Sequence, residues 1–169
     1  MQLSDSRDIA AEPATVWAAI LDPEVLRRCV PGCQSMAGSI ASGYEAVVKQ
    51  KVGPVSATFT GLVTISDITD GQSLRISGEG KGGAAGFARG GAQVIFAPVE
   101  GGTRLSYQVE VHVGGKLAQL GSRIIDGFAR KLADEFFARF QEAVEGAGAA
   151  GDPERDGAAK KGWFGRIVG

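Results

Sequence analysis

Apolar residues recur every three or four positions across residues 115–144, which is the spacing of one face of an α-helix. Charged residues occupy the other side, which is therefore expected to face water. The segment predicts one long amphipathic helix that needs a broad apolar partner. The apolar stripe consists of Leu117, Leu120, Ile124, Phe128, Leu132, Phe136, Phe140 and Val144. The water-facing set consists of Lys116, Arg123, Asp126, Arg130, Lys131, Asp134, Arg139, Glu142 and Glu145.

The segment before residue 32 predicts a strand followed by two short helices. Residues 3–11 carry the apolar positions of a strand. Pro13 suits the first turn of a helix, and Asp22 followed by Pro23 is an N-cap with proline at the first helical position. The pair Pro31 and Gly32 ends the second helix.

Residues 44–113 alternate between apolar and polar positions, which is the period of β-strands with one buried face. Turn signals at 53–54, 70–71 and 101–102 divide the segment, so we expect about six antiparallel strands. Strands followed by a separate long helix predict an α+β fold in which a curved sheet wraps around the helix. Such an arrangement often leaves a space between its two layers.

The composition is that of a globular protein without a strong charge bias. A chain of 169 residues fits one domain, and its net charge of −1 gives no overall attraction to nucleic acid. Acidic residues precede any apolar run at the start, which argues against a secretory signal. No apolar run is long enough to span a bilayer. We therefore expect a cytoplasmic protein.

The segment after residue 145 changes in composition. We expect a domain over residues 1–145, a flexible linker over the small, glycine-rich residues 146–159, and an amphipathic tail over residues 160–169. As a helix, the tail would place aromatic and aliphatic side chains on one side of a basic segment, which suits a headgroup interface. A groove on a partner protein fits the same residues, and so does a frayed end. The contact residues are Lys160, Lys161, Trp163, Phe164, Arg166, Ile167 and Val168.

Candidate catalytic groups are sparse on the predicted inward faces. Alternation places His112 outward, and it places Tyr44 and Tyr107 inward, either as core residues or as donors to a ligand carbonyl. No carboxylate pair or nucleophile–base pair accompanies them. The interpretation is therefore a protein without a catalytic site, covalent cofactor or metal.

Two further groups have mainly structural interpretations. Cys29 and Cys33 flank Pro31 and Gly32 and are expected to pack structurally, with thiol chemistry, a disulfide or a metal as the alternatives. The glycine-rich residues 78–91 lie between strands and predict a flexible hairpin rim rather than a phosphate loop. That rim offers Lys81, Phe87 and Arg89 as contacts, for a partner or as a gate.

Three stretches carry a family resemblance. The segment EPATVWAAILDPEVLRRCVPGC resembles the opening of START/Bet v 1-like helix-grip proteins. The sequence CVPGC at 29–33, the glycine-rich GEGKGGAAGFARGGAQV, and GKLAQLGSRIIDGFARKLADEFFARF at 115–140 resemble the carbon monoxide dehydrogenase G-subunit family. The resemblance covers roughly residues 2–145. It implies a seven-stranded antiparallel sheet that grips the C-terminal helix around a hydrophobic cavity.

The resemblance also implies a function. It predicts a hydrophobic-ligand-binding and membrane-recruitment accessory protein for a molybdenum-containing carbon monoxide dehydrogenase or related molybdenum hydroxylase. The cavity would suit a quinone or another isoprenoid or lipid, and the protein would lie peripherally on the inner face of the cell membrane. The alternatives are a helix-grip enzyme of the polyketide cyclase type and a ligand-free assembly factor. The expected cavity residues are Trp17, Phe59, Tyr107, Phe128, Leu132 and Phe136.

Overall fold

The computed structural model describes residues 1–150, with side chains described through Gly146. Its core is one antiparallel sheet in the order β1-β7-β6-β5-β4-β3-β2, which confirms the predicted seven-stranded α+β architecture. The strands are Gln2–Ile9 (β1), Cys33–Ser39 (β2), Gly43–Val52 (β3), Val55–Thr69 (β4), Ser73–Lys81 (β5), Phe87–Val99 (β6) and Gly102–Gly114 (β7). The helices are Pro13–Ile20 (α1), Pro23–Cys29 (α2), Lys116–Gln119 (α3) and Ser122–Ala150 (α4), with a short 3-10 turn, η1, over Gly83–Ala85.

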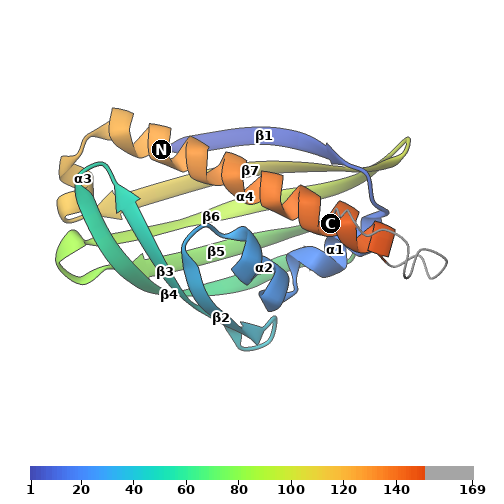
Figure 1. Cartoon of the computed structure of the whole chain (residues 1–169), viewed down its shortest axis with the longest axis horizontal. Helices are drawn as coiled ribbons and strands as arrows, with labels where there is room; N and C mark the ends of the chain where they lie inside the picture. Colours follow the sequence, from blue (N-terminus) through green and yellow to red (C-terminus); the bar gives the residue numbers. More distant parts are fainter. Residues whose placement is uncertain (151–169) are drawn as a thin grey trace.

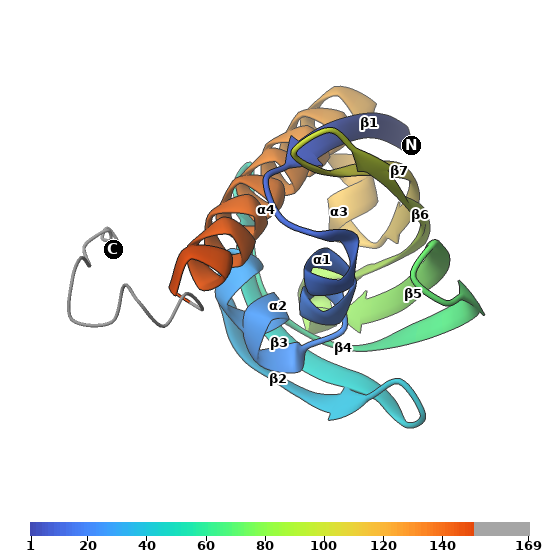
Figure 2. The same cartoon turned by 90° about the vertical axis from the view of Figure 1, so that its right-hand side faces the viewer.

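The sheet curls so strongly that its two edge strands approach each other, and α4 lies across the gap between them (Figures 1 and 2). Consecutive strands from β2 to β7 pair through short connections, whereas β1 returns to pair with β7. Helices α1 and α2 fill one end of the interior, and α3 and η1 lie at the other end (Figure 1). The sheet and helix therefore enclose the interior from all sides except the two ends.

The short helices begin as the sequence predicts. Both α1 and α2 start with proline, whose missing N–H has no helical partner to lose at that position. The Asp22 carboxylate accepts a hydrogen bond of 2.9 Å from the Glu24 amide and so caps α2.

The long helix is not continuous, which corrects the prediction for residues 115–144. The chain breaks between α3 and α4 at Gly121, where φ is +90°. This left-handed conformation is one that glycine adopts without steric cost and that ends a helix. Helix α4 continues to Ala150, into the range expected to be a linker.

The break also shifts which residues face inward. Ile124 was expected in the apolar stripe but is 41% exposed, beside the β3–β4 turn. Asp126 was expected to face water but is half-buried, with its Oδ1 atom enclosed by protein. Among the described residues, no helix is long and apolar enough to cross a membrane. The predicted tail contacts at 160–169 lie outside the described residues.

Candidate functional site

The interior between sheet and helix has two halves that differ in packing. The half near α1 and α2 is filled by large side chains. Tyr107 stacks on Phe137 with 4.4 Å between ring centroids, and Phe136 and Phe140 stack at 5.9 Å. The Trp17 ring meets Phe96 edge-on at 5.1 Å. This half is a close-packed core.

The other half, toward the β5–β6 hairpin, is lined by small residues. Strand alternation and register place Gly78 and Gly80 of β5 on the inner face, beside Ala88 and Gly90 of β6. The concave surface there forms a pocket of about 290 Å³. The pocket is lined by Ile76, Gly78, Ala88, Arg89, Gly90, Gly91, Ala92, Val109, Glu110 and Val111. Alternation turns the side chains of Arg89 and Glu110 to the outer face, so the inner lining is apolar.

Helix α4 continues this contrast across the interior. By helical spacing, Ala129 and Ala133 share the side of α4 that carries Phe136 and Phe140. These two alanines lie on the first half of the helix, whereas the large rings of Phe136 and Phe140 lie on its second half, in or against the packed core. We call the pocket over the small strand residues the apolar hollow.

Several of the predicted cavity residues are only half-buried. Phe59, Phe128 and Leu132 all retain accessible surface, in contrast to Phe140, which has none. The Phe59 ring lies so close to Gly82 that a Cβ atom there would be 2.5 Å from it. These side chains therefore keep apolar surface accessible, which a site for an apolar ligand requires.

The six predicted cavity residues fall into two sets. Trp17, Tyr107 and Phe136 belong to or pack against the core at the α1–α2 end. Phe59 lies beside Gly80 and Gly82, and Phe128 and Leu132 are half-buried on α4. None of the six lines the pocket itself. Sequence reasoning selected large apolar residues, whereas the pocket exists because its lining residues are small.

The signal that could have found the lining lies in the glycine-rich run at 78–91. Only the turn between Lys81 and Phe87 is a hairpin tip, and the rest forms β5 and β6, which corrects the interpretation of the whole run as a rim. Read with period two, its inner positions are glycine or alanine almost throughout. Small residues at alternate positions of a strand leave space over one face.

Few polar groups reach the interior. The Tyr44 hydroxyl donates to the Leu21 carbonyl at 2.6 Å. Burial raises the pKa of both Tyr44 and Tyr107, so both hydroxyls stay protonated at neutral pH. Arg7 pairs with Asp134 at 2.9 Å, and its guanidinium lies 5.7 Å from the centre of the Phe137 ring. These groups belong to the packed half, and the side chains on the inner lining of the apolar hollow are apolar.

The remaining candidates lie elsewhere. His112 is exposed on the outer face, as predicted. Cys29 is buried, and both it and Cys33 are free thiols, the latter 3.3 Å from the Ser35 carbonyl oxygen. Between residues 1 and 146, no group of three His, Cys, Asp or Glu side chains is placed to hold a metal.

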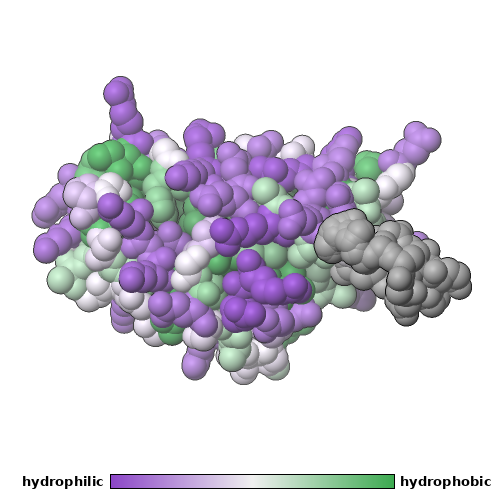
Figure 3. Space-filling view, in the orientation of Figure 1, coloured by the Kyte–Doolittle hydropathy of each residue, from purple (hydrophilic) through white to green (hydrophobic). Residues whose placement is uncertain are grey.

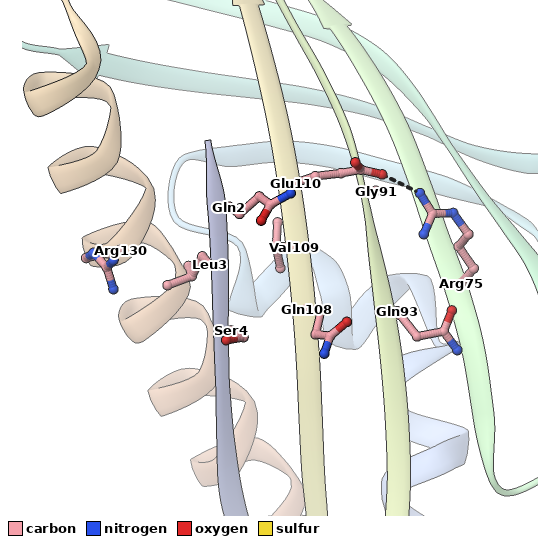
Figure 4. Close-up of a pocket in the computed structure, with 10 residues that line it drawn as sticks. All are labelled: Gln2, Leu3, Ser4, Arg75, Gly91, Gln93, Gln108, Val109, Glu110 and Arg130. Atoms are coloured by element: carbon pink, nitrogen blue, oxygen red, sulfur yellow. Dashed lines mark hydrogen bonds and ion pairs between the residues drawn. The ribbon is translucent and has the colours of Figure 1, made fainter.

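A larger pocket, of about 600 Å³, lies on the outer face of the sheet (Figure 4). Gln93 and Gln108 point into it, and Arg75 reaches across Gly91 to Glu110 at 2.8 Å. A Cβ atom on Gly91 would be 2.5 Å from this guanidinium. The outer pocket is therefore a polar shelf, and the apolar hollow is the better match to an apolar ligand.

Comparison with known proteins places the chain in context. The family model described as the G-subunit of carbon monoxide dehydrogenase (CoxG) matches residues 6–145. A conserved protein from Geobacillus kaustophilus is similar at 26% identity and a TM-score of 0.79, covering 85% of this chain and 95% of that one. No curated protein sequence matches the chain.

More distant solved structures share the fold alone. A protein from Thermus thermophilus has a TM-score of 0.66 at 16% identity, with 87% of this chain and 99% of that one covered. Ara h 8.0201 has a TM-score of 0.57 at 14% identity, with 85% and 97% covered. These structures support the helix-grip architecture.

Proposed function

The chain belongs to the CoxG family of carbon monoxide dehydrogenase subunits, and on that premise we propose that it is an accessory protein that binds an apolar ligand in the apolar hollow. The observation that carries the proposal is the apolar pocket that the small residues of β5 and β6 leave over the inner face of the sheet. An apolar ligand would bury apolar surface that is now accessible, and this burial would contribute about 25 cal/mol of binding free energy per Å².

The family name suggests which protein would be the partner. A dehydrogenase that contains molybdenum must pass electrons onward, and a lipid-soluble quinone is a carrier of the right polarity for the apolar hollow. We therefore propose a quinone or a related isoprenoid as the ligand, and a carbon monoxide dehydrogenase or related molybdenum hydroxylase as the partner. The tail at 160–169 would add a membrane contact through its basic and aromatic residues.

Filling the apolar hollow tests the proposal. Gly78 has a φ outside the left-handed region, and a Cβ atom there would meet its nearest neighbours at 3.6 Å, so Gly78→Val should fold. Valine also favours a strand. We expect it to reduce uptake of decylubiquinone at least tenfold, because its methyl groups occupy ligand space.

Ser77→Val is the matched control, since Ser77 is the neighbour on the outer face of the same strand. It should leave decylubiquinone uptake unchanged. Fluorescence titration would measure decylubiquinone binding, and thermal unfolding would show that both variants are folded. Equal uptake by the two variants would exclude the apolar hollow as the site.

A further inference from the structure

The two ends of the molecule differ in charge. The end that carries the β3–β4 turn, the β5–β6 turn, α3 and the start of α4 comprises residues 47–60, 80–88 and 113–125. We call it the hairpin end. These ranges contain five basic residues and no acidic residue. All five are exposed, and none pairs with a carboxylate between residues 1 and 146. They are Lys49, Lys51, Lys81, Lys116 and Arg123.

The opposite end is acidic. Asp67 lies at the end of β4, Asp70 lies in the β4–β5 turn, and Glu100 lies in the β6–β7 turn. Arg104 near that turn is already paired with Asp8 at 2.8 Å. The protein is therefore close to neutral as a whole but has a charge dipole along its long axis.

Apolar groups sit within the basic end as well. Ile124 is 41% exposed and lies beside Gly53, where a Cβ atom would be 3.6 Å from its Cγ2. Pro54, which follows Gly53 in the β3–β4 turn, is also exposed. In the space-filling view, apolar surface at the end that carries α3 is bordered by hydrophilic side chains (Figure 3). Ile68 at the acidic end is 42% exposed, so exposed apolar surface alone does not distinguish the ends, and charge does.

The hairpin end is also where the apolar hollow comes closest to the surface. Its pocket begins at Ala88, directly behind the β5–β6 turn. At this end η1 contacts α3, and Ala85 of η1 and Leu117 of α3 are both buried. Helix α3 is only four residues long and is bounded by Gly115 at φ +73° and Gly121 at φ +90°.

We propose that the hairpin end docks on an anionic lipid bilayer, with α3 covering the route from the lipid into the apolar hollow. The basic residues would meet lipid phosphates, while Ile124 and Pro54 would enter the headgroup region. This contact belongs to the folded body and is separate from the tail. The inference rests on the proposed function for its purpose, because docking here would present the apolar hollow to a membrane-dissolved ligand.

Vesicle binding by the full chain tests the inference. Neutralising two basic residues of the hairpin end, K51Q with K116Q, should weaken partition onto phosphatidylglycerol-containing vesicles roughly 30-fold, since each basic residue contributes about fivefold. The matched control is K131Q with R139Q, which removes the same charge from exposed positions of α4. Co-sedimentation would measure both, with phosphatidylcholine vesicles as the uncharged reference.

The outcomes are distinct. A much larger loss for the hairpin-end pair than for the α4 pair supports the docking face, as does weaker binding by Ile124→Ser than by Ile68→Ser. Equal losses, or none, overturn it. So does unchanged vesicle binding with lost binding to the purified dehydrogenase, which would make the face a protein contact. Decylubiquinone uptake in vesicle-free solution reports on the proposed function alone, and the hairpin-end pair should leave it unchanged.

Discussion

Glycines on the inner face of the sheet lack side chains for two different reasons. At Gly90 a Cβ atom would lie 2.2 Å from the Glu110 carbonyl oxygen, so the main chain of the next strand occupies its place. At Gly80 the nearest neighbour would be the Phe59 Cβ at an ordinary 3.6 Å. The first glycine permits the curvature of the sheet, and the second leaves open space.

Alanine at the two positions should therefore have opposite effects. Gly90→Ala should lower the free energy of unfolding by about 1–3 kcal/mol, because strand β7 must shift. Gly80→Ala should leave it unchanged or raise it by about 0.5–1 kcal/mol, since alanine loses less entropy on folding. Urea denaturation of both variants measures this. Similar losses at both positions would mean that the interior is tighter than described.

The buried thiol of Cys29 gives the stability a dependence on pH. Burial raises the pKa of Cys29 above its usual value of 9.0, so the folded state keeps the proton longer than the unfolded chain does. The stability that this raised pKa contributes is fully present below pH 9, and it is lost as the pH rises from there toward the folded-state pKa. Cys29→Ala should flatten the decline just above pH 9 in thermal unfolding. Tyr44 and Tyr107 would still contribute at higher pH.

At the scale of elements, the break between α3 and α4 decides the shape of the hairpin end. The 3.6-residue periodicity runs through residues 115–144 without interruption, so pattern alone predicts one helix. A single glycine in the left-handed region overrides it, because the chain must turn from the end of β7 onto the open side of the sheet. The break therefore also changes which residues at the start of α4 face inward.

Two glycines of this region form a matched test. Gly121→Ala should destabilise the protein by about 1–2 kcal/mol, since alanine at φ +90° is strained even though no atom lies within 4 Å. Gly127 lies inside α4 in equally open space, so Gly127→Ala should stabilise by about 1 kcal/mol. Thermal unfolding shows whether each substitution raises or lowers the stability. Stabilisation by both would show that the break is not fixed by the backbone.

The order of elements was accessible from the sequence, whereas the pocket was not. The prolines, Asp22 and the alternating strand pattern predict α1, α2 and the sheet close to their observed residue ranges. Pattern reasoning seeks large apolar residues, and so it named Trp17 and Tyr107, which pack in the core. A pocket lined by Gly78, Gly90 and Ala92 is defined by missing volume, which becomes visible only when strand register brings the small residues together.

At the scale of the whole molecule, the interior divides into a packed half and a half with an apolar pocket. The aromatic cluster at the α1–α2 end holds the sheet and α4 together. The apolar hollow lies toward the opposite, basic end. This division explains how a fold of this size can keep accessible apolar surface inside without collapsing.

The division predicts unequal costs for the same substitution. Phe140 is fully buried, and Phe140→Ala should lower the free energy of unfolding by about 3–5 kcal/mol. Phe128 is only half-buried, so Phe128→Ala should cost roughly half of that or less. Guanidinium denaturation gives both values. Equal costs would mean that the two halves are packed alike.

Native mass spectrometry of the purified full chain, before and after organic extraction, is the most direct test of the apolar hollow as a ligand site. We expect a mass increment of one apolar molecule per chain, which is lost on extraction, restored by added quinone, and absent from Gly78→Val. A wild-type chain that carries no increment and takes up no added apolar ligand would contradict it.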